Sequence, residues 1–254
     1  MYKFYLKRKI KSILIWMTIL IAFTIGALSK FESFANDTQA TEQLLNSFPK
    51  VIMIVYGMND IDITQIEGYY AMIYQYITII LGVYGAILGS KIIYEEEDLK
   101  TSEFIFTKPI KRAKLYLNKI LCSITVLIIL NLISICINYL YIKNNYFIFD
   151  LFYLLSFLQF IICLFSLSLG LMFSTLKYNK YGTILSAGFI TLFFILKVYA
   201  EIKELNFSYF SIFYAFSYNN ISNNFSLIYV LYYMILTIIL ILIGKVLLQK
   251  KDLI

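Results

Sequence analysis

Six apolar stretches, each long enough to cross the hydrocarbon layer of a membrane, constrain what this chain of 254 residues can fold into. A spanning helix needs about 20 mostly apolar residues. The stretches cover residues 12–29, 69–90, 120–142, 151–176, 181–200 and 225–244. Only the fifth contains a charge, Lys197, which lies near enough to its end for the ammonium to reach the membrane surface. The sequence therefore predicts an all-α membrane protein with six transmembrane helices.

Composition excludes several other classes. The chain is 61% apolar and 15% charged, whereas soluble domains are about 45–50% apolar and about 25% charged. It contains no histidine, which excludes His-ligated zinc and catalytic dyads that use a histidine base. Its three cysteines, Cys122, Cys136 and Cys163, all lie within apolar stretches, so neither a disulfide framework nor a metal site is predicted.

The basic residues predict the orientation of the six spans. If the N-terminus is cytoplasmic, the cytoplasmic segments hold 17 of the 22 lysines and arginines. Cytoplasmic loops of membrane proteins carry such an excess, so both termini are expected inside. Segment 30–67 is then an extracellular loop and segment 91–119 is the main cytoplasmic loop. The net charge of +7 reflects this topology, and no nucleic-acid partner is expected.

Three segments between the spans leave alternatives open. Residues 1–11 form either a basic amphipathic helix in the membrane interface or a plain run of cytoplasmic charges. Segment 30–67 has helical spacing of apolar residues, which favours one or two short helices that cap the outer surface or gate a pathway. The aromatic segment 201–224 is either a pair of re-entrant or interfacial helices, turning at Asn219, Asn220, Asn223 and Asn224, or a loop in the interface.

Glycines and polar residues within the spans give two further indications. Gly82, Gly85 and Gly89 lie on the second span, and the last two form a G-x-x-x-G pattern that allows close helix packing. The uncharged polar groups within the spans include Gln75, Asn131, Asn138 and Gln159, and no acidic residue lies clearly at the midplane. A proton- or sodium-coupled carrier usually needs such a group, so this class is disfavoured.

The cytoplasmic loop 91–119 mixes acidic, basic and apolar residues. Pro109 disfavours helix at the preceding residue and is tolerated in the first turn of a new helix. We therefore expect a short helix over 92–106, a break, and a second helix that starts at Pro109 and continues into the third span. Over 109–142 that helix would measure about 51 Å at 1.5 Å per residue, so its first turns would project into the cytoplasm.

The loop contains Glu95–Glu97, then Thr101-Ser102-Glu103, then Pro109-Ile110-Lys111-Arg112, followed by Lys119 at the start of the third span. With these residues it resembles the loop that follows the second span in ABC-2 type transporter permeases. The ending Lys250-Lys251-Asp252-Leu253 is also similar to the family. Lys100 departs from the pattern, since the family usually has glycine there. The likeness in topology extends over the whole chain.

The resemblance implies a single permease domain, residues 1–254, with a type V exporter-like bundle. Such a permease is half of the translocation pathway of an ATP-driven exporter, with a second permease half, the same or homologous, and two cytoplasmic ATPase subunits. The residues implied in coupling to the ATPase are Glu95, Glu96, Glu97, Leu99, Glu103, Phe106, Pro109 and Arg112. Glu95–Glu97 in particular would meet basic side chains of that subunit.

No G-x-x-x-x-G-K-[ST] sequence occurs in the chain, so ATP and Mg²⁺ are expected on the partner ATPase and no cofactor on this chain. The chain is therefore not expected to be an enzyme. A composition rich in Ile, Lys, Asn and Tyr favours the plasma membrane of a low-GC bacterium. The aromatic surface favours a hydrophobic or amphipathic cargo, such as a peptide, drug or antimicrobial.

Three other classes compete with this interpretation. An ion-coupled secondary carrier would need midplane charge or an inverted repeat. A membrane-embedded metalloprotease would need histidine or equivalent ligands, but the chain has no histidine and its Glu95–Glu97 run is expected in a cytoplasmic loop. A membrane assembly protein without transport activity would need no ATPase. An ATPase with a Walker A motif that co-purifies with the chain would separate the exporter from all three.

Overall fold

The computed structural model describes residues 2–98, 112–143, 149–175 and 181–250, and all the regular secondary structure in these ranges is helical. Six of the helices are long and apolar enough to cross a membrane, which confirms the predicted fold class. They are α1 (Tyr2–Leu28), α5 (Ile66–Asp98), α7 (Arg112–Ile142), α8 (Phe149–Ser174), α9 (Gly182–Lys203) and α12 (Leu227–Lys250).

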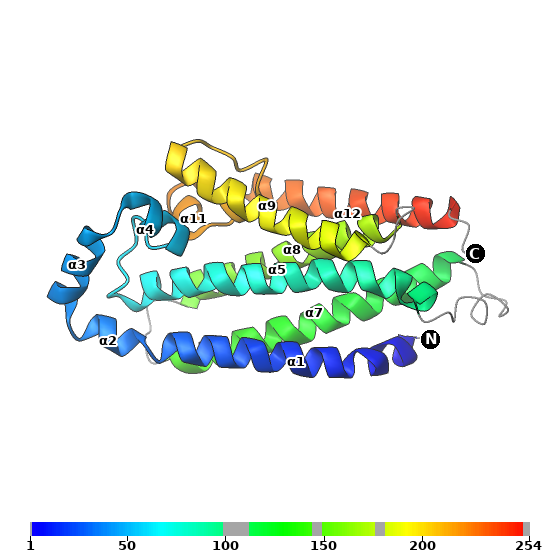
Figure 1. Ribbon diagram of the computed structural model, residues 1–254, viewed down its shortest axis with the longest axis horizontal. Coiled ribbons are helices and arrows are strands. Elements are labelled where there is room, and N and C mark those ends of the chain that lie inside the picture. The colour runs from blue at the N-terminus through cyan, green and yellow to red at the C-terminus, as the bar shows by residue number, and fades with distance from the viewer. Residues whose placement is uncertain (1, 99–111, 144–148, 176–180, 251–254) are drawn as a thin grey trace.

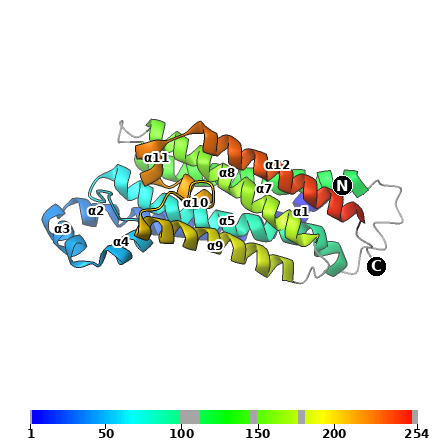
Figure 2. The same ribbon diagram turned by 90° about the horizontal axis from the view of Figure 1, so that it is seen from above.

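The six long helices run lengthwise beside one another, and both chain termini lie at the same end of the bundle (Figures 1 and 2). We call this the terminal end. The opposite, loop end carries the short helices (Figure 1). These are α2 (Phe31–Ala35), α3 (Thr38–Ser47), α4 (Lys50–Tyr56), α10 (Ile212–Ala215) and α11 (Tyr218–Asn224).

The centre of the bundle is the packing of α5 against α8. The most apolar window is 78% buried in α8 and 61% in α5, but only 22% in α9 and α12 and 17% in α1. Because lipid is as apolar as a protein core, apolar character alone does not determine which face of a spanning helix is buried. The buried face is determined by small residues, which allow two helix backbones to approach closely.

Three glycines make this close approach possible. A Cβ on Gly89 would overlap with the backbone carbonyl oxygen of Leu167 and lie 3.0 Å from the nitrogen of Leu171. A Cβ on Gly170 of α8 would meet α5 in the same way, 2.9 Å from the nitrogen of Ser90. Gly85 faces the carbonyl of Cys163, with a Cβ distance of 3.0 Å. Backbone atoms cannot move aside as flexible side chains do, so the α5–α8 contact depends on these positions.

Two helices at the terminal end differ from expectation. The first eleven residues do not form a separate helix in the membrane interface, because α1 is one helix of 27 residues from Tyr2 to Leu28. The short helix expected over 92–106 does not begin as a separate helix. Residues 92–98 belong instead to α5, which continues from the second span to Asp98 and has 33 residues in all. Both helices are stabilised there by contacts with each other and with α7, described below.

The loop end contains more helix than expected. Segment 30–67 forms three short helices in place of one or two, and Pro49 separates α3 from α4. Segment 201–224 includes the pair α10 and α11, which favours the helix-pair interpretation over the loop. The asparagines expected at its turn lie in α11 instead, because Ser217 caps that helix by accepting a hydrogen bond from the amide of Asn220.

Candidate functional site

The residues implied in coupling lie at, or next to, the terminal end of the bundle. The backbones of Glu95, Glu96 and Glu97 form the last turn of α5, and Arg112 is the first residue of α7. The side chains of Glu96, Glu97 and Arg112, and the whole of Leu99, Glu103, Phe106 and Pro109, fall outside the described part of the structure. The structure thus places the first and last members of the set on two neighbouring long helices.

Glu95 is held by two basic side chains of α1. Its Oε1 lies 3.2 Å from Nη2 of Arg8, and its Oε2 accepts a hydrogen bond of 2.8 Å from Nζ of Lys9. These side chains are a quarter exposed or less, so solvent screens the pairs less than it screens exposed ones. Glu95 therefore joins the start of α1 to the end of α5, and its oxygens already have partners within the chain.

The start of α1 also packs on α7. Tyr5 is 2% exposed, and its ring centroid lies 5.6 Å from Nζ of Lys119 on α7, which is 1% exposed. One turn earlier, the hydroxyls of Tyr2 and Thr125 lie 2.8 Å apart. The first turns of α1 are therefore part of the bundle, which is why they do not lie apart in the interface.

This junction of α1, α5 and α7 was not predicted from the sequence. One signal was present, since Tyr2, Tyr5 and Lys9 recur at spacings of three and four residues, which places them on one face of a helix. The basic residues were interpreted as topology determinants or as the polar face of an interfacial helix, and not as partners of another helix. Arg8 and Lys9 instead pair with the carboxylate of Glu95. Lys9 and Glu95 are 86 residues apart in the sequence, so no local pattern predicts their contact.

The interior of the bundle holds uncharged polar pairs. Nε2 of Gln159 on α8 donates to Oδ1 of Asn131 on α7 over 2.9 Å, and both side chains are buried. Asn138 donates to the carbonyl of Ser134 one turn before it in α7. Within the described long helices, acidic residues occur only in the first two or last two turns. The interior therefore offers hydrogen bonds between helices but no midplane carboxylate of the kind that ion-coupled carriers use.

Comparison with known proteins gives one match. The sequence model of a family described as "ABC-2 family transporter protein" matches residues 5–253. A search of curated proteins finds no match. A search of solved structures also finds none.

Proposed function

The chain belongs to the ABC-2 transporter family, and on that premise we propose that it is the membrane-spanning permease subunit of an ATP-driven exporter. The observation that carries the proposal is the family match over residues 5–253, together with six helices able to span a membrane. ATP hydrolysis falls to a separate subunit, because the sequence has no phosphate-binding G-x-x-x-x-G-K-[ST] loop. Co-purification of such a subunit with the chain tests the proposal.

We assign the terminal end of the bundle to the cytoplasm. Support comes from the bias of lysine and arginine, because 17 of the 22 lie in the terminal segments and in the connections on the same side. The structure adds that both termini lie at one end (Figure 1). With this orientation, α2–α4 and α10–α11 lie at the outer surface, in the plasma membrane of a bacterium.

Thiol labelling tests the orientation. In a background with Cys122, Cys136 and Cys163 replaced, we expect an impermeant maleimide to label Asp37→Cys and Asn220→Cys in intact cells. Thr101→Cys and Gln249→Cys should react only after the cells are opened, because the reagent cannot cross the membrane. Labelling of Thr101→Cys in intact cells at the rate of Asp37→Cys would overturn the orientation and, with it, the position of the ATPase.

The ATPase would dock at the terminal end, on the last turn of α5 and the segment that leads to α7. At 1.5 Å per residue, the 33 residues of α5 and the 31 of α7 measure about 50 Å and about 46 Å, against about 30 Å of hydrocarbon. Both helices are therefore long enough to protrude on the cytoplasmic side and to carry a push from a moving ATPase into the membrane. Because Glu95 is paired with Arg8 and Lys9, the docking charge is assigned to Glu96 and Glu97.

The full transporter would contain two permease chains, the same or homologous, and two ATPase subunits that bind ATP and Mg²⁺. The cargo that fits this chain best is hydrophobic or amphipathic, such as a peptide, drug or antimicrobial. The chain has 23 Tyr and 22 Phe, and aromatic side chains offer large apolar contact areas. A panel of such compounds, tested for stimulation of ATP hydrolysis by the reconstituted complex, would identify the class.

A further inference from the structure

At the loop end, α4 lies beside the last turns of α9 in both views of the bundle (Figures 1 and 2). The side chain of Ile54 lies on the inner face of α4 and is 1% exposed. The outer face carries Val51, Ile52 and Val55, all exposed. The helix is bounded by Pro49 before it and by Gly57 after it. It is therefore a short segment with its own breaks at both ends, laid over the long helices.

A chain of polar groups runs from α9 through α5 to α4. Nζ of Lys197 lies 2.9 Å from Oε2 of Glu201 and donates over 2.6 Å to Oε1 of Gln75 on α5. Nε2 of Gln75 in turn donates over 3.3 Å to the carbonyl oxygen of Val55 in the last turn of α4. The side chains of Lys197 and Glu201 are only 4% and 11% exposed. We call Glu201, Lys197 and Gln75 the polar strap.

The end of α4 fits this strap closely. The carbonyl groups in the last turn of a helix lack partners within the helix. Here the carbonyl of Val55 accepts from Gln75, and the carbonyl of Tyr56 accepts over 3.2 Å from the hydroxyl of Tyr76. Gly57 adopts a φ of 72°, and a Cβ there would lie only 2.6 Å from Oε1 of Gln75. The positive φ of the turn therefore favours glycine, and a larger residue there would displace the end of the Gln75 side chain.

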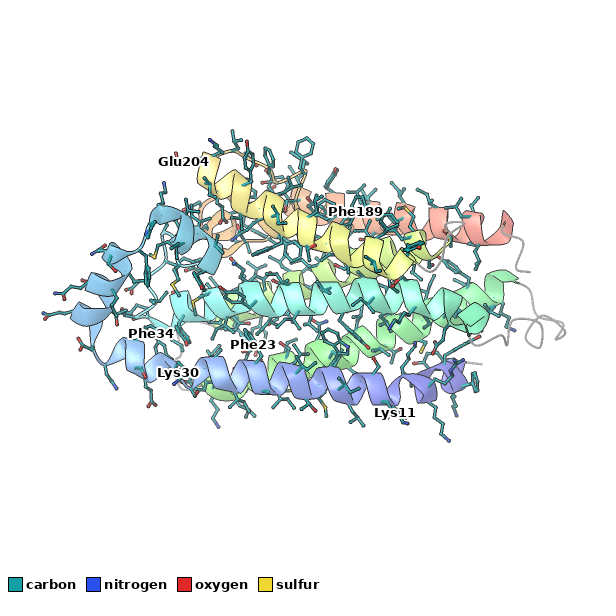
Figure 3. All side chains as sticks on the ribbon, in the orientation of Figure 1. Lys11, Phe23, Lys30, Phe34, Phe189 and Glu204 are labelled. Carbon is teal, nitrogen blue, oxygen red and sulfur yellow. The ribbon has the colours of Figure 1, made fainter. Side chains whose placement is uncertain are left out.

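The other end of α4 is tied only at the surface. Nζ of Lys50 lies 2.9 Å from Oε1 of Glu204, and both side chains are more than half exposed. Their hydrogen bond lowers the pKa of Glu204 and raises the pKa of Lys50. Glu204 lies at the loop end of α9 (Figure 3). Exposed ion pairs are screened and contribute little. The hydrogen bond from Gln75 to Val55 is also exposed, but the oxygen of the same Gln75 amide is held by the buried Lys197.

Below the strap lies a small cavity between α5, α9 and α10. Its volume is about 20 Å³, which is room for about one water molecule. Tyr74, Thr78, Phe194, Phe213 and Asn219 are among its lining residues, together with the strap itself. The cavity is far too small for a cargo molecule, and Gly57, the residue that follows α4, lies at its lining beside the strap.

We propose that α4 is a lid on the outer end of the transport pathway and that Gln75, whose side-chain oxygen is held by Lys197, is the latch that holds the lid closed. The role in transport rests on the proposed function. A permanent cap would be sealed best by apolar side chains, because burying an ion pair costs a desolvation penalty that its attraction only partly offsets. When the lid lifts, water reaches Lys197 and Glu201 and that penalty is recovered. The closed state is therefore only modestly favoured, as a gate requires.

Labelling of a thiol under the lid tests the latch. Ile54→Cys, in the background without native cysteines, should react slowly with an impermeant maleimide in nanodiscs. We expect the double change Lys197→Met with Glu201→Leu to slow the labelling, because it removes the desolvation penalty of the closed state. We expect Gln75→Met, which removes the donor to the carbonyl of Val55, to speed the labelling about tenfold. That factor corresponds to a loss of about 1.4 kcal/mol from the closed state. The double change avoids leaving one buried charge unpaired, which would risk unfolding.

The matched control is Lys50→Gln, which removes the exposed pair and should change the labelling rate less than about twofold. Unchanged labelling after both strap variants, each eluting as a monodisperse species, would overturn the latch. This measurement needs neither ATP nor a partner, so it stands or fails independently of the proposed function.

A second arm tests the role in transport. When the chain is assembled with its ATPase in nanodiscs, Mg-ATP should speed the labelling of Ile54→Cys relative to Mg-ADP, because the lid opens during turnover. A rate that responds to the strap variants but not to ATP would overturn the assignment of α4 as a gate of the pathway.

Discussion

Replacing Gly89 with leucine is expected to prevent the six-helix bundle from forming. The two central helices meet at this point through their backbones, and a Cβ on Gly89 already overlaps with the carbonyl of Leu167. Since backbone cannot rotate away, α5 and α8 would have to separate and lose the packing on both sides of the contact. Overpacking in a core usually costs about 1–3 kcal/mol, and four added carbon atoms against backbone should exceed that range. Heat stability in detergent, followed by size-exclusion chromatography, measures the loss.

Gly188→Leu provides the matched control for Gly89→Leu. Gly188 lies on α9, and nothing stands within 4 Å of a Cβ placed there. The same change should therefore leave the bundle as stable as the parent, or slightly more so, because glycine within a helix is unfavourable by roughly 0.5–1 kcal/mol relative to alanine. Equal stability of the Gly89 and Gly188 variants would contradict the packing of α5 on α8.

Reversing the charges at the end of α5 is expected to release the ATPase. Glu96→Lys with Glu97→Lys replaces two acidic groups by two basic ones at the surface where we place the docking contact. Charge-assisted hydrogen bonds from basic side chains to a carboxylate would be replaced by repulsion between like charges. We expect the ATPase to be absent, or reduced to a small fraction, when the double variant is purified in physiological salt.

Glu95→Gln is the control for this charge reversal. The amide keeps an oxygen that can accept a hydrogen bond from Arg8 or Lys9. Glu95 pairs with these residues of α1 and is not assigned to the docking surface. This variant should retain the ATPase, with some loss of heat stability. If the double reversal keeps the ATPase at parental stoichiometry across a salt series, Glu96 and Glu97 are not the docking surface.

The number and class of the helices followed from the sequence because a membrane imposes a simple length rule. About 20 apolar residues are needed per crossing, and each of the six stretches satisfied it. The helix ends at the terminal side did not follow. α1 and α5 extend beyond the apolar stretches because Lys9 pairs with Glu95 and Tyr5 packs near Lys119 of α7. Contacts between residues so far apart in sequence leave no periodic signal in either segment.

The candidate sites show the same division. The spacing of Gly85 and Gly89 marked one face of a helix for close packing, but only the structure identifies Gly170 on α8 as the residue that meets it. Lys197 was expected to extend to the membrane surface. It instead lies 3% exposed between Glu201 and Gln75. The spacing of four between Lys197 and Glu201 was a usable signal, whereas the contribution of Gln75 from another helix was not.

Purification of the tagged chain from its native membrane, followed by analysis of subunits and of ATP hydrolysis, is the most direct measurement of its function. We expect an ATPase with a Walker A motif to co-purify at one copy per permease chain, with two of each per complex. Hydrolysis should stop when the Walker A lysine of that subunit is replaced. A transport-active assembly that contains no such ATPase would show that the chain is not the permease of an ATP-driven exporter.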